Sequence, residues 1–435
     1  MEDCFLTTTG LIMKGEEVYG ERLSDLTDTR KGAESRSTLL EQDFAEQGFR
    51  NKRNAKRRTR KAKSMWLVFA LLVAATVFIW TWCLRPKWRE EWEYRQGFLA
   101  SANETYEVET AKDFDGVKIQ ELDAKFLPGG DGDPNGERRL IFVGDVHGCA
   151  DELKHLLKML EFDQKKDHLI AVGDVISKGP KNVDVLDELI RIGADSVRGN
   201  HEDRVLELAP KSLDVDGLPN IEIASSKGKE KDVALLKELS KHHLRYLRDM
   251  PLMLRIPPLP QAKKSSAKDS SPIAEEILVV HAGLVPAVPL RRQDPYFVMN
   301  MRSIRWKTHA PLVEAKDKKK KSKPWHKIWE WYNDRVFRKK SLKGFVMWDD
   351  EIESEAEDEV TQAGIFDRLL PSTSKKSWPK PQVVVYGHHS KAGLKISRWS
   401  KGLDTGCVKG ERLTAMVLDA RGTQELVSVK CKDHI

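Results

Sequence analysis

The sequence predicts an α/β protein with parallel strands, preceded by a single membrane-spanning helix. Short apolar runs with the length of buried strands alternate with helical stretches, such as ADELKHLLKML (150–160) and KNVDVLDELIRIG (181–193). Several of these runs end in glycine followed by aspartate or histidine. Ahead of them lies an uncharged run at positions 65–84. These three observations give the fold class and divide the chain into an anchor and a folded domain.

The chain begins with a polar tail and an apolar segment. Residues 1–64 are charged and lack sustained hydrophobic periodicity, which predicts a flexible cytosolic tail. The run MWLVFALLVAATVFIWTWCL (65–84) matches a hydrocarbon core of roughly 30 Å. A cleavable signal peptide does not lie behind so long a tail, and a buried core helix rarely lacks polar residues all round. The sequence therefore predicts a signal anchor that spans a lipid bilayer.

The charges that flank this segment predict its orientation. Nine Lys or Arg residues and no acid lie between Arg50 and Lys63, whereas residues 85–91 mix both signs. By the positive-inside rule the tail is cytosolic and the chain beyond residue 84 is lumenal or extracellular. The glycosylation pattern at Asn103 agrees with this orientation, although such tripeptides are common by chance. Residues 85–137 are expected to form a lumenal stem.

Metal-binding side chains follow the predicted strands from residue 138 onward. The segments are IFVGDVHG (141–148), LIAVGDVISKG (169–179), VRGNHE (197–202), ILVVHAG (277–283) and VVVYGHHS (383–390). An apolar run that ends in Gly-Asp indicates a buried strand with its ligand at the carboxyl edge of the sheet. Two divalent cations about 3.5–4 Å apart can clamp phosphoryl oxygens and activate water. They require a bridging carboxylate with oxygen and imidazole ligands on either side.

This pattern predicts a two-metal phosphoesterase site. Asp174 is the natural bridging carboxylate. One metal is assigned to the first motif, and the other to the third motif and the two later histidines. The predicted ligands are Asp145, His147, Asp174, Asn200, His281 and His388.

The ordered motifs resemble those of the calcineurin-like metallophosphatases, which run GDxHG, GDxxxxG, GNHE, HxG and GHx. The resemblance covers about residues 138–430 and implies a four-layer αββα sandwich over residues 138–435, with helices outside two sheets. It also implies that His201 protonates the leaving oxygen and that Lys178 and Arg302 bind phosphate. Arg305 lies three residues from Arg302 and is the alternative to it.

One departure from the family pattern indicates which branch of the family this chain resembles. Ser/Thr protein phosphatases usually carry Asp-Arg where this chain has Ser177-Lys178, so the residue that orients His201 stays open. The segments GDVISKGP, VHGCADEL and LDTGCVKGERLTA (403–415) are instead similar to the diadenosine-tetraphosphatase branch and its eukaryotic relatives.

A domain of this branch on a type II anchor resembles the fungal endopolyphosphatases, which are zinc-dependent vacuolar membrane proteins. The resemblance implies cleavage of phosphoanhydride bonds inside long-chain inorganic polyphosphate in the vacuolar lumen. Two divalent ions are expected, Zn²⁺ first, with Mn²⁺, Co²⁺ or Mg²⁺ as alternatives. A Ser/Thr protein phosphatase or a dinucleoside tetraphosphate hydrolase would share the metal site, and a non-catalytic membrane scaffold is the remaining alternative.

Composition argues against a specific nucleic-acid binder. The net charge is +7, and residues 1–84 hold 14 basic and 11 acidic residues, which leaves 60 and 56 for the rest. A nearly balanced domain lacks the basic surface that nucleic acid requires. The lysine run KDKKKKSK (316–323) is expected to be a solvated loop, or to steer a polyanionic substrate.

Five cysteines do not make a disulfide framework in a chain of this length. Cys149 and Cys407 each follow a glycine of a site motif and are expected to pack as small buried side chains, not to form a bridge. The chain has no CxxC motif, which argues against a thiolate zinc site. The segment PWHKIWEWY (324–332) has one apolar helical face, which is typical of core packing.

Overall fold

The computed structural model describes residues 29–89, 92, 114–209, 230–262, 273–305, 308–315, 321–338 and 380–435. Within the chain, two compact units are distinguished, Met1–Trp88 and Arg89–Ile435. The predicted sequon at Asn103 and the lysines at 316 and 318–320 lie outside the described residues.

The first unit contains one long helix. Helix α1 (Thr29–Phe78) continues into the π-helix η1 (Ile79–Leu84). The part of the predicted flexible tail that begins at Thr29 is therefore helical, since its many Ala, Glu, Lys and Arg residues favour a helix. The helix stretch Lys56–Arg89 contains a segment long and apolar enough to cross a membrane, by length and composition. That it does so stays a prediction.

A five-stranded sheet carries the first three motifs of the second unit. Strands β2, β3 and β4 run parallel, and β13 and β14 add an antiparallel edge. The order across the sheet is β14 (Gln424–Lys430), β13 (Arg412–Asp419), β2 (Arg139–Val143), β3 (Asp167–Ala171) and β4 (Asp195–Ser196).

A six-stranded sheet carries the two histidine motifs. Strands β6, β10 and β12 run parallel to one another. The order is β1 (Ile119–Glu121), β5 (Met253–Ile256), β6 (Glu276–Val280), β10 (Gln382–Tyr386), β12 (Ser400–Gly402) and β11 (Lys395–Ile396). A small third sheet contains β8 (Pro311–Leu312), β7 (Ser303–Arg305) and β9 (Ser322–Pro324).

Helices cover the outer faces of the two large sheets. Along β2, Leu140 and Phe142 point into the core shared with the six-stranded sheet, whereas Ile141 and Val143 point toward the helices, as the two-residue period of a strand requires. The helices are α3 (Ala150–Met159), α4 (Asn182–Ile192), α5 (Asn200–Leu206), α6 (Glu230–Glu238), α7 (Lys241–Asp249), α8 (Pro295–Asn300) and α9 (Trp325–Phe337), with 3₁₀ turns at Ala124–Phe126, Leu290–Arg292 and Ser390–Ala392.

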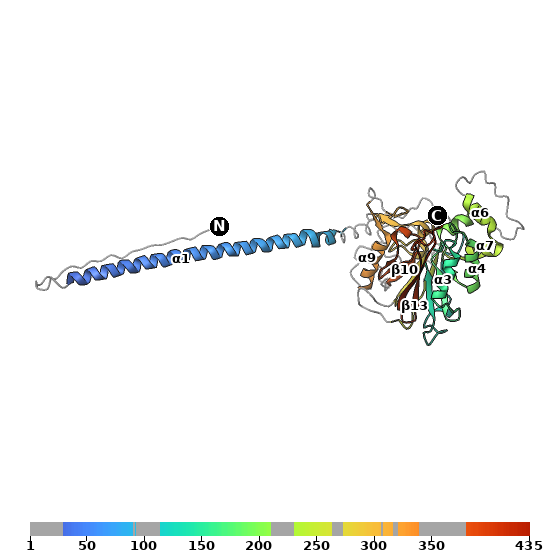
Figure 1. Ribbon diagram of the computed structural model, residues 1–435, viewed down its shortest axis with the longest axis horizontal. Helices are drawn as coiled ribbons and strands as arrows, with labels where there is room; N and C mark the ends of the chain where they lie inside the picture. The colour runs from blue at the N-terminus through green and yellow to red at the C-terminus, as the bar shows by residue number, and fades with distance from the viewer. Residues whose placement is uncertain are drawn as a thin grey trace, which may run out of the picture. The chain divides into compact units, whose positions relative to one another are not determined.

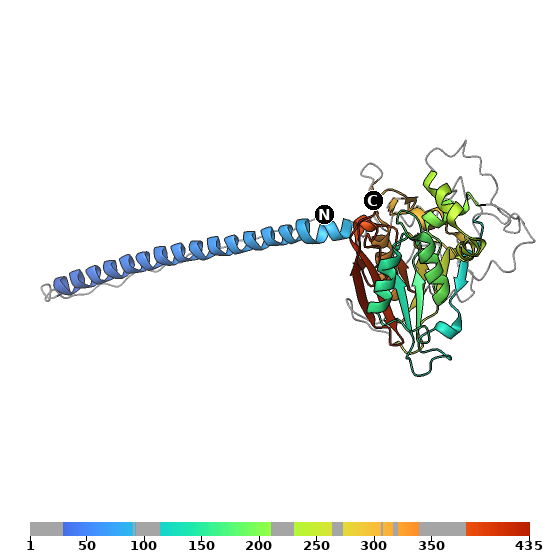
Figure 2. The same ribbon diagram turned by 45° about the vertical axis from the view of Figure 1, so that its right-hand side comes forward.

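The layers follow from this packing. Helices α3 and α4 lie on one side of the strands and α9 lies on the other (Figure 1), and Figure 2 shows the green helices alongside the strands. The predicted apolar face of α9 is buried: Trp325, Ile328, Trp329 and Tyr332. This is the helix–sheet–sheet–helix arrangement that the family resemblance implied.

The expectation for Cys407 was wrong. Its sulfur is bonded to that of Cys431, which lies 24 residues further along the chain. Strands β13 and β14 pair Arg412 with Lys430, so the residues just before β13 and just after β14 lie side by side. Composition does not reveal a pairing that depends on the register of a hairpin. Cys149 is a buried free thiol, as expected.

Candidate metal centre

All six predicted metal ligands lie just beyond the ends of strands. Asp145 and His147 follow β2, Asp174 follows β3, and Asn200 is the first residue of α5 after β4. In the other sheet His281 follows β6 directly, and His388 lies two residues beyond β10. The carboxyl ends of parallel strands in both sheets therefore bring their polar side chains together, in the place where α/β sheets form sites.

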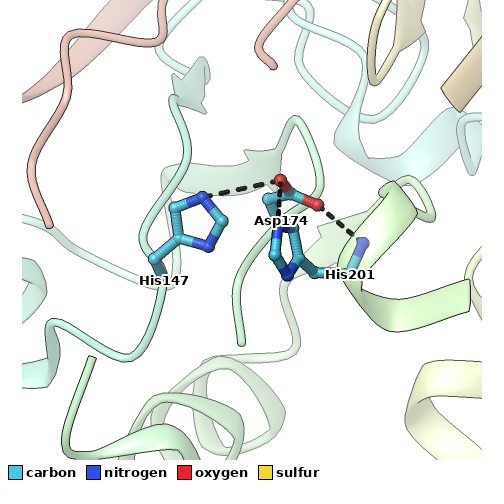
Figure 3. A group of neighbouring side chains, drawn as sticks. All are labelled: His147, Asp174 and His201. Atoms are coloured by element: carbon cyan, nitrogen blue, oxygen red, sulfur yellow. Dashed lines mark hydrogen bonds and ion pairs between the residues drawn. The ribbon is translucent and has the colours of Figure 1, made fainter. Parts of the chain in front are cut away.

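Asp174 lies between two groups of ligand atoms. Its Oδ2 is 3.5 Å from His147 Nε2 and 3.9 Å from His201 Nε2, and Figure 3 shows these three side chains turned toward one another. Its Oδ1 is 3.3 Å from His281 Nε2. Each group has donor atoms that lie within 4.8 Å of one another, with His388 in the second. One carboxylate thus faces both groups, as a bridging ligand must.

The second group contains two nitrogens that face one oxygen. Asn200 Oδ1 lies 3.1 Å from His281 Nε2 and 3.1 Å from His388 Nδ1. The opposite ring nitrogens donate to backbone carbonyls, His281 Nδ1 to Val172 at 2.9 Å and His388 Nε2 to Asn300 at 3.0 Å. The ring nitrogens that face Asn200 Oδ1 are therefore available as ligands. In the metal-free protein a proton on His281 Nε2 can lie between these acceptor atoms, and a divalent ion could take its place, so this group fits a metal ion.

The first group has the same arrangement. His147 Nδ1 donates to the carbonyl of Ile176 at 3.1 Å, which leaves Nε2 directed toward Asp174. The Nζ of Lys178 lies 2.7 Å from that same Nε2. In this structure the ammonium group of Lys178 thus donates a hydrogen bond to His147 Nε2, the nitrogen that was predicted to bind a metal.

Buried carboxylates dominate the electrostatics of the centre. Burial and the neighbouring carboxylate of Asp404 raise the pKa of Asp145 well above its ordinary value. Burial disfavours a charged His281, but the carboxylates of Asp174 and Asp145 outweigh burial and raise the pKa of His281 to about 10. Buried carboxylates that make a histidine this basic form an environment suited to divalent cations.

Asp404 is a residue of the centre that the sequence analysis did not assign. It follows β12, which is parallel to β10, so the strand-end rule applies to it as well. Its Oδ1 accepts a hydrogen bond from the amide of Gly406 at 3.0 Å. The signal was weak because β12 reads Ser-Lys-Gly and is not an apolar run.

Glu202 is a second such residue, and it holds the ligand loops together. The side chain is fully buried at the start of α5. Its Oε2 accepts from the amides of Asp174 at 2.8 Å and Gly199 at 2.9 Å, and its Oε1 from that of Ile176 at 3.1 Å. Burial and the charge of Asp174 raise the pKa of Glu202 to about 7. A single carboxylate thus accepts hydrogen bonds from three parts of the centre: Asp174, Ile176, whose carbonyl holds His147, and the residue before Asn200.

The backbone at several site residues is left-handed. His147 (φ 48), Asp174 (φ 51) and His388 (φ 70) adopt this conformation, as do Ser177 (φ 73) and Lys178 (φ 69). Each such residue costs about 1–3 kcal/mol and persists only when its surroundings enforce it. The buried hydrogen bonds of Glu202 and of the backbone provide that constraint around Asp174.

Of the two candidate arginines, Arg302 faces the centre. Burial lowers the pKa of its guanidinium, against the attraction of the carboxylates of Asp174, Asp404 and Asp145. Its Nη1 donates to the carbonyl of Val313 at 3.2 Å, and the side chain is half-buried. Arg302 therefore adds positive charge beside the ligands, in a position suited to an anionic group.

His201 lies in the centre without an orienting acid. Burial, together with the charge of Lys178, lowers the pKa of His201 to about 4. Its Nδ1 is buried and has no hydrogen-bond partner among the described residues, and the same holds for the hydroxyl of Ser177. The sequence left open which residue orients His201, and the described part of the structure contains no such residue.

Comparison with known proteins gives a consistent picture. A family model described as calcineurin-like phosphoesterase matches residues 138–405. The symmetrical bis(5'-nucleosyl)-tetraphosphatase of Aeromonas salmonicida is 26% identical over 302 residues, which cover 67% of this chain and 98% of that protein.

Other similarities are shorter or weaker. The symmetrical bis(5'-nucleosyl)-tetraphosphatase of Tolumonas auensis is 32% identical over 148 residues, 33% of this chain and 44% of the relative, so this alignment spans less than half of that protein. A crystal structure of a proposed diadenosine tetraphosphatase is 26% identical, with a TM-score of 0.45, and covers 73% of this chain and 99% of that chain.

Proposed function

Because this chain belongs to the calcineurin-like phosphoesterase family, we propose that it is a two-metal hydrolase of phosphoanhydride bonds, with a dinucleoside tetraphosphate as its first candidate substrate. Membership makes the chain a metal-dependent phosphohydrolase. The observation that carries the proposal is the position of Asp174, whose two oxygens face two separate groups of ligand atoms. The substrate class is taken from the relatives named as tetraphosphatases.

The residues divide the work in the following way. Two divalent ions, when bound, neutralise phosphoryl charge and make a bound water more acidic. One ion would be held by Asp145, His147 and Asp174, and the other by Asp174 with Asn200, His281 and His388. Arg302 and Lys178 supply positive charge that can bind the phosphoryl groups, Lys178 as a point charge and Arg302 as a planar fork.

The environment of His201 favours an anhydride over an ester. Among the described residues no acid holds its Nδ1, so its position as a proton donor is weakly fixed. A phosphate leaving group needs little protonation, whereas a serine alkoxide needs a well-placed acid. The replacement of the family Asp by Ser177 therefore costs less with a phosphoanhydride substrate.

Inorganic polyphosphate is a second candidate substrate, because positive charge continues beyond the centre. His389 follows the predicted ligand His388, and burial, then Arg302, Lys391 and Lys409, lower its pKa. Lys409 Nζ donates to Ser390 Oγ at 2.6 Å, which places this exposed lysine beside the ligand loop. Cations grouped near the centre suit a substrate with more phosphates than two metal ions can bind. This is the endopolyphosphatase activity expected from the sequence, with Zn²⁺ as its first candidate ion.

We also propose that the catalytic unit lies in a lumen, with the vacuole as the candidate organelle. The basic run before residue 65 and the apolar helix support a type II anchor. The Cys407–Cys431 bond adds an independent argument, because structural disulfides persist in oxidising compartments and are rare in the cytosol. Glycosylation at Asn103 would mark the same side of the membrane.

One experiment separates the candidates. The full chain is purified in detergent, stripped of metal and reloaded with Zn²⁺, Mn²⁺, Co²⁺ or Mg²⁺, then given diadenosine tetraphosphate, long-chain polyphosphate or a phosphopeptide. Metal-dependent hydrolysis of the dinucleotide that is lost in Asn200→Ala supports the first candidate, and progressive shortening of polyphosphate alone supports the second. Activity confined to the phosphopeptide would overturn both, and the absence of any metal-dependent hydrolysis would favour a non-catalytic scaffold.

A further inference from the structure

A second cluster of metal-binding side chains lies outside the candidate metal centre. Cys149, Glu152 and His434 bring a thiol sulfur, a carboxylate oxygen and a ring nitrogen within 4.8 Å of one another. Cys149 and Glu152 are buried, and His434 is half-buried. We propose that these three side chains hold a third metal ion, a structural Zn²⁺, in addition to the two ions of the catalytic centre.

The cluster joins two parts of the chain that are far apart in sequence. Cys149 precedes α3 as its N-cap residue, and Glu152 lies in the first turn of that helix. His434 lies in the tail that follows β14, near the end of the chain. No local sequence motif unites these residues, which is why the lack of a CxxC pattern argued against a thiolate site.

The tail is held in place at successive residues. The disulfide fixes Cys431 to Cys407, the amide of Lys432 donates to Glu152 Oε1 at 3.2 Å, and the amide of His434 donates to the carbonyl of Val408 at 3.0 Å. Residues beyond a last strand ordinarily fray unless something fixes them. These bonds bring His434 to the start of α3 and set the spacing of the three donor atoms.

The donor set matches the preference of zinc. Thiolate, imidazole and carboxylate are its usual protein ligands; structural zinc sites usually have four of them, so with three side chains here a water would have to complete the tetrahedron. Sulfur selects Zn²⁺ over Mg²⁺ or Ca²⁺. Glu152 Oε1 already accepts the amide of Lys432, which orients the carboxylate and leaves Oε2 to bind the ion. Among the described residues, no hydrogen bond engages the ring of His434.

The position of the cluster gives the ion a structural role. Cys149 lies on the same loop as the predicted catalytic ligands Asp145 and His147. An ion on Cys149 would tie this loop, the start of α3 and the end of the chain together. It would stabilise the loop without contact with the substrate, so the inference goes beyond the proposed activity and does not depend on which phosphate compound is cleaved.

Cobalt spectroscopy tests the inference independently of activity. The predicted ligands of the catalytic centre are nitrogen and oxygen atoms only, so thiolate-to-cobalt charge-transfer absorption can arise only from a cysteine ligand. The protein is the full chain in detergent with Cys4→Ser and Cys83→Ser, which removes the other thiols outside the disulfide. After loading with Co²⁺ this parent should show the band and bind about three ions per chain.

Matched variants identify the site. Cys149→Ser should abolish the band and lower the metal content by about one ion per chain. Asp174→Asn should lose ions but keep the band. His155→Ala, which removes an exposed histidine of the same helix, should change neither. If Cys149→Ser does not fold, His434→Ala should weaken the band and release the ion more readily to a chelator. A parent without the band, or a band unchanged in Cys149→Ser and His434→Ala, would overturn the proposal.

Discussion

The substitution Glu202→Gln tests the hydrogen bonds that support the metal centre without changing any predicted metal ligand. Glutamine keeps the shape of the side chain but replaces one acceptor oxygen with an NH₂ donor. If its oxygen keeps the amides of Asp174 and Gly199, the NH₂ group must face the amide of Ile176, which is now 3.1 Å from Oε1. A hydrogen bond to a charged group contributes about 1.5–3 kcal/mol to stability. Removing the buried charge also removes its desolvation cost, so the free energy of unfolding should fall by about 2 kcal/mol in total.

The effect on metal binding should be larger than the effect on folding. The three amides belong to Asp174 itself, to the residue before Asn200 and to Ile176, whose carbonyl holds His147. Changes to such supporting partners typically cost 10–100-fold in metal affinity or activity. We therefore expect Glu202→Gln to bind Zn²⁺ about 10–100-fold more weakly than the parent.

The assay is a titration of the metal-stripped full chain with Zn²⁺ against a competing chelator, together with urea unfolding. Glu330→Gln is a matched control. Its carboxylate is partly buried and accepts two hydrogen bonds, from the amide of Trp399 and the hydroxyl of Ser400, but it lies on α9 away from the centre. An affinity of Glu202→Gln equal to that of the parent, or a loss of the same size in Glu330→Gln, would refute the role given to Glu202.

Three further predictions concern protons, the substrate and the disulfide. The raised pKa of His281 favours the folded metal-free protein below about pH 6.5, and this contribution should disappear as pH rises toward 10; urea unfolding of metal-stripped protein across this range should show the decline, and a flat or rising profile would contradict it. Ser177→Asp should raise the ratio of phosphoserine to phosphoanhydride hydrolysis about tenfold, because an acid at this position can orient His201 toward the poor alkoxide leaving group; an unchanged ratio in steady-state assays of both substrates would count against the account of Ser177. Replacing both Cys407 and Cys431 with Ala should lower the free energy of unfolding by about 3–4 kcal/mol for a loop of this length, measured by urea unfolding of the metal-stripped protein; equal stability of the double variant and the parent would show that the bond does not stabilise the fold.

The gathering of the six predicted ligands in one place could be predicted because each is next to its strand in the sequence. An apolar run marks the strand, a glycine marks the turn, and the Asp, Asn or His follows within a few residues, as at Asp145 and His281. Parallel strands then bring these ends together. Asp404 was missed only because its strand is short and polar, so the apolar-run criterion did not detect it.

Other parts of the site depend on three-dimensional relations that a local pattern does not contain. Glu202 reaches the amide of Asp174 because the loop after β3 turns through left-handed residues. The bond between Cys407 and Cys431 depends on the register of β13 against β14. The contact of His434 with the start of α3 depends in turn on that bond. In each case the contact joins residues that are distant in the sequence, so it can be recognised only once the fold has placed the two segments side by side.

Lys178 links metal binding to substrate binding through a single atom. Its Nζ lies 2.7 Å from His147 Nε2, the lone pair that the first ion needs, and the lone pair cannot serve both. Lys178 is exposed and on a long side chain, so it can leave that nitrogen at little cost, whereas His147 is buried and held by Ile176. We therefore expect a metal ion on His147 to displace the ammonium group, which would then need a new anionic partner next to the centre. A phosphoryl group beside Arg302 would be such a partner, so in the proposed function Lys178 would contact a ligand nitrogen in the empty centre and phosphate in the loaded one.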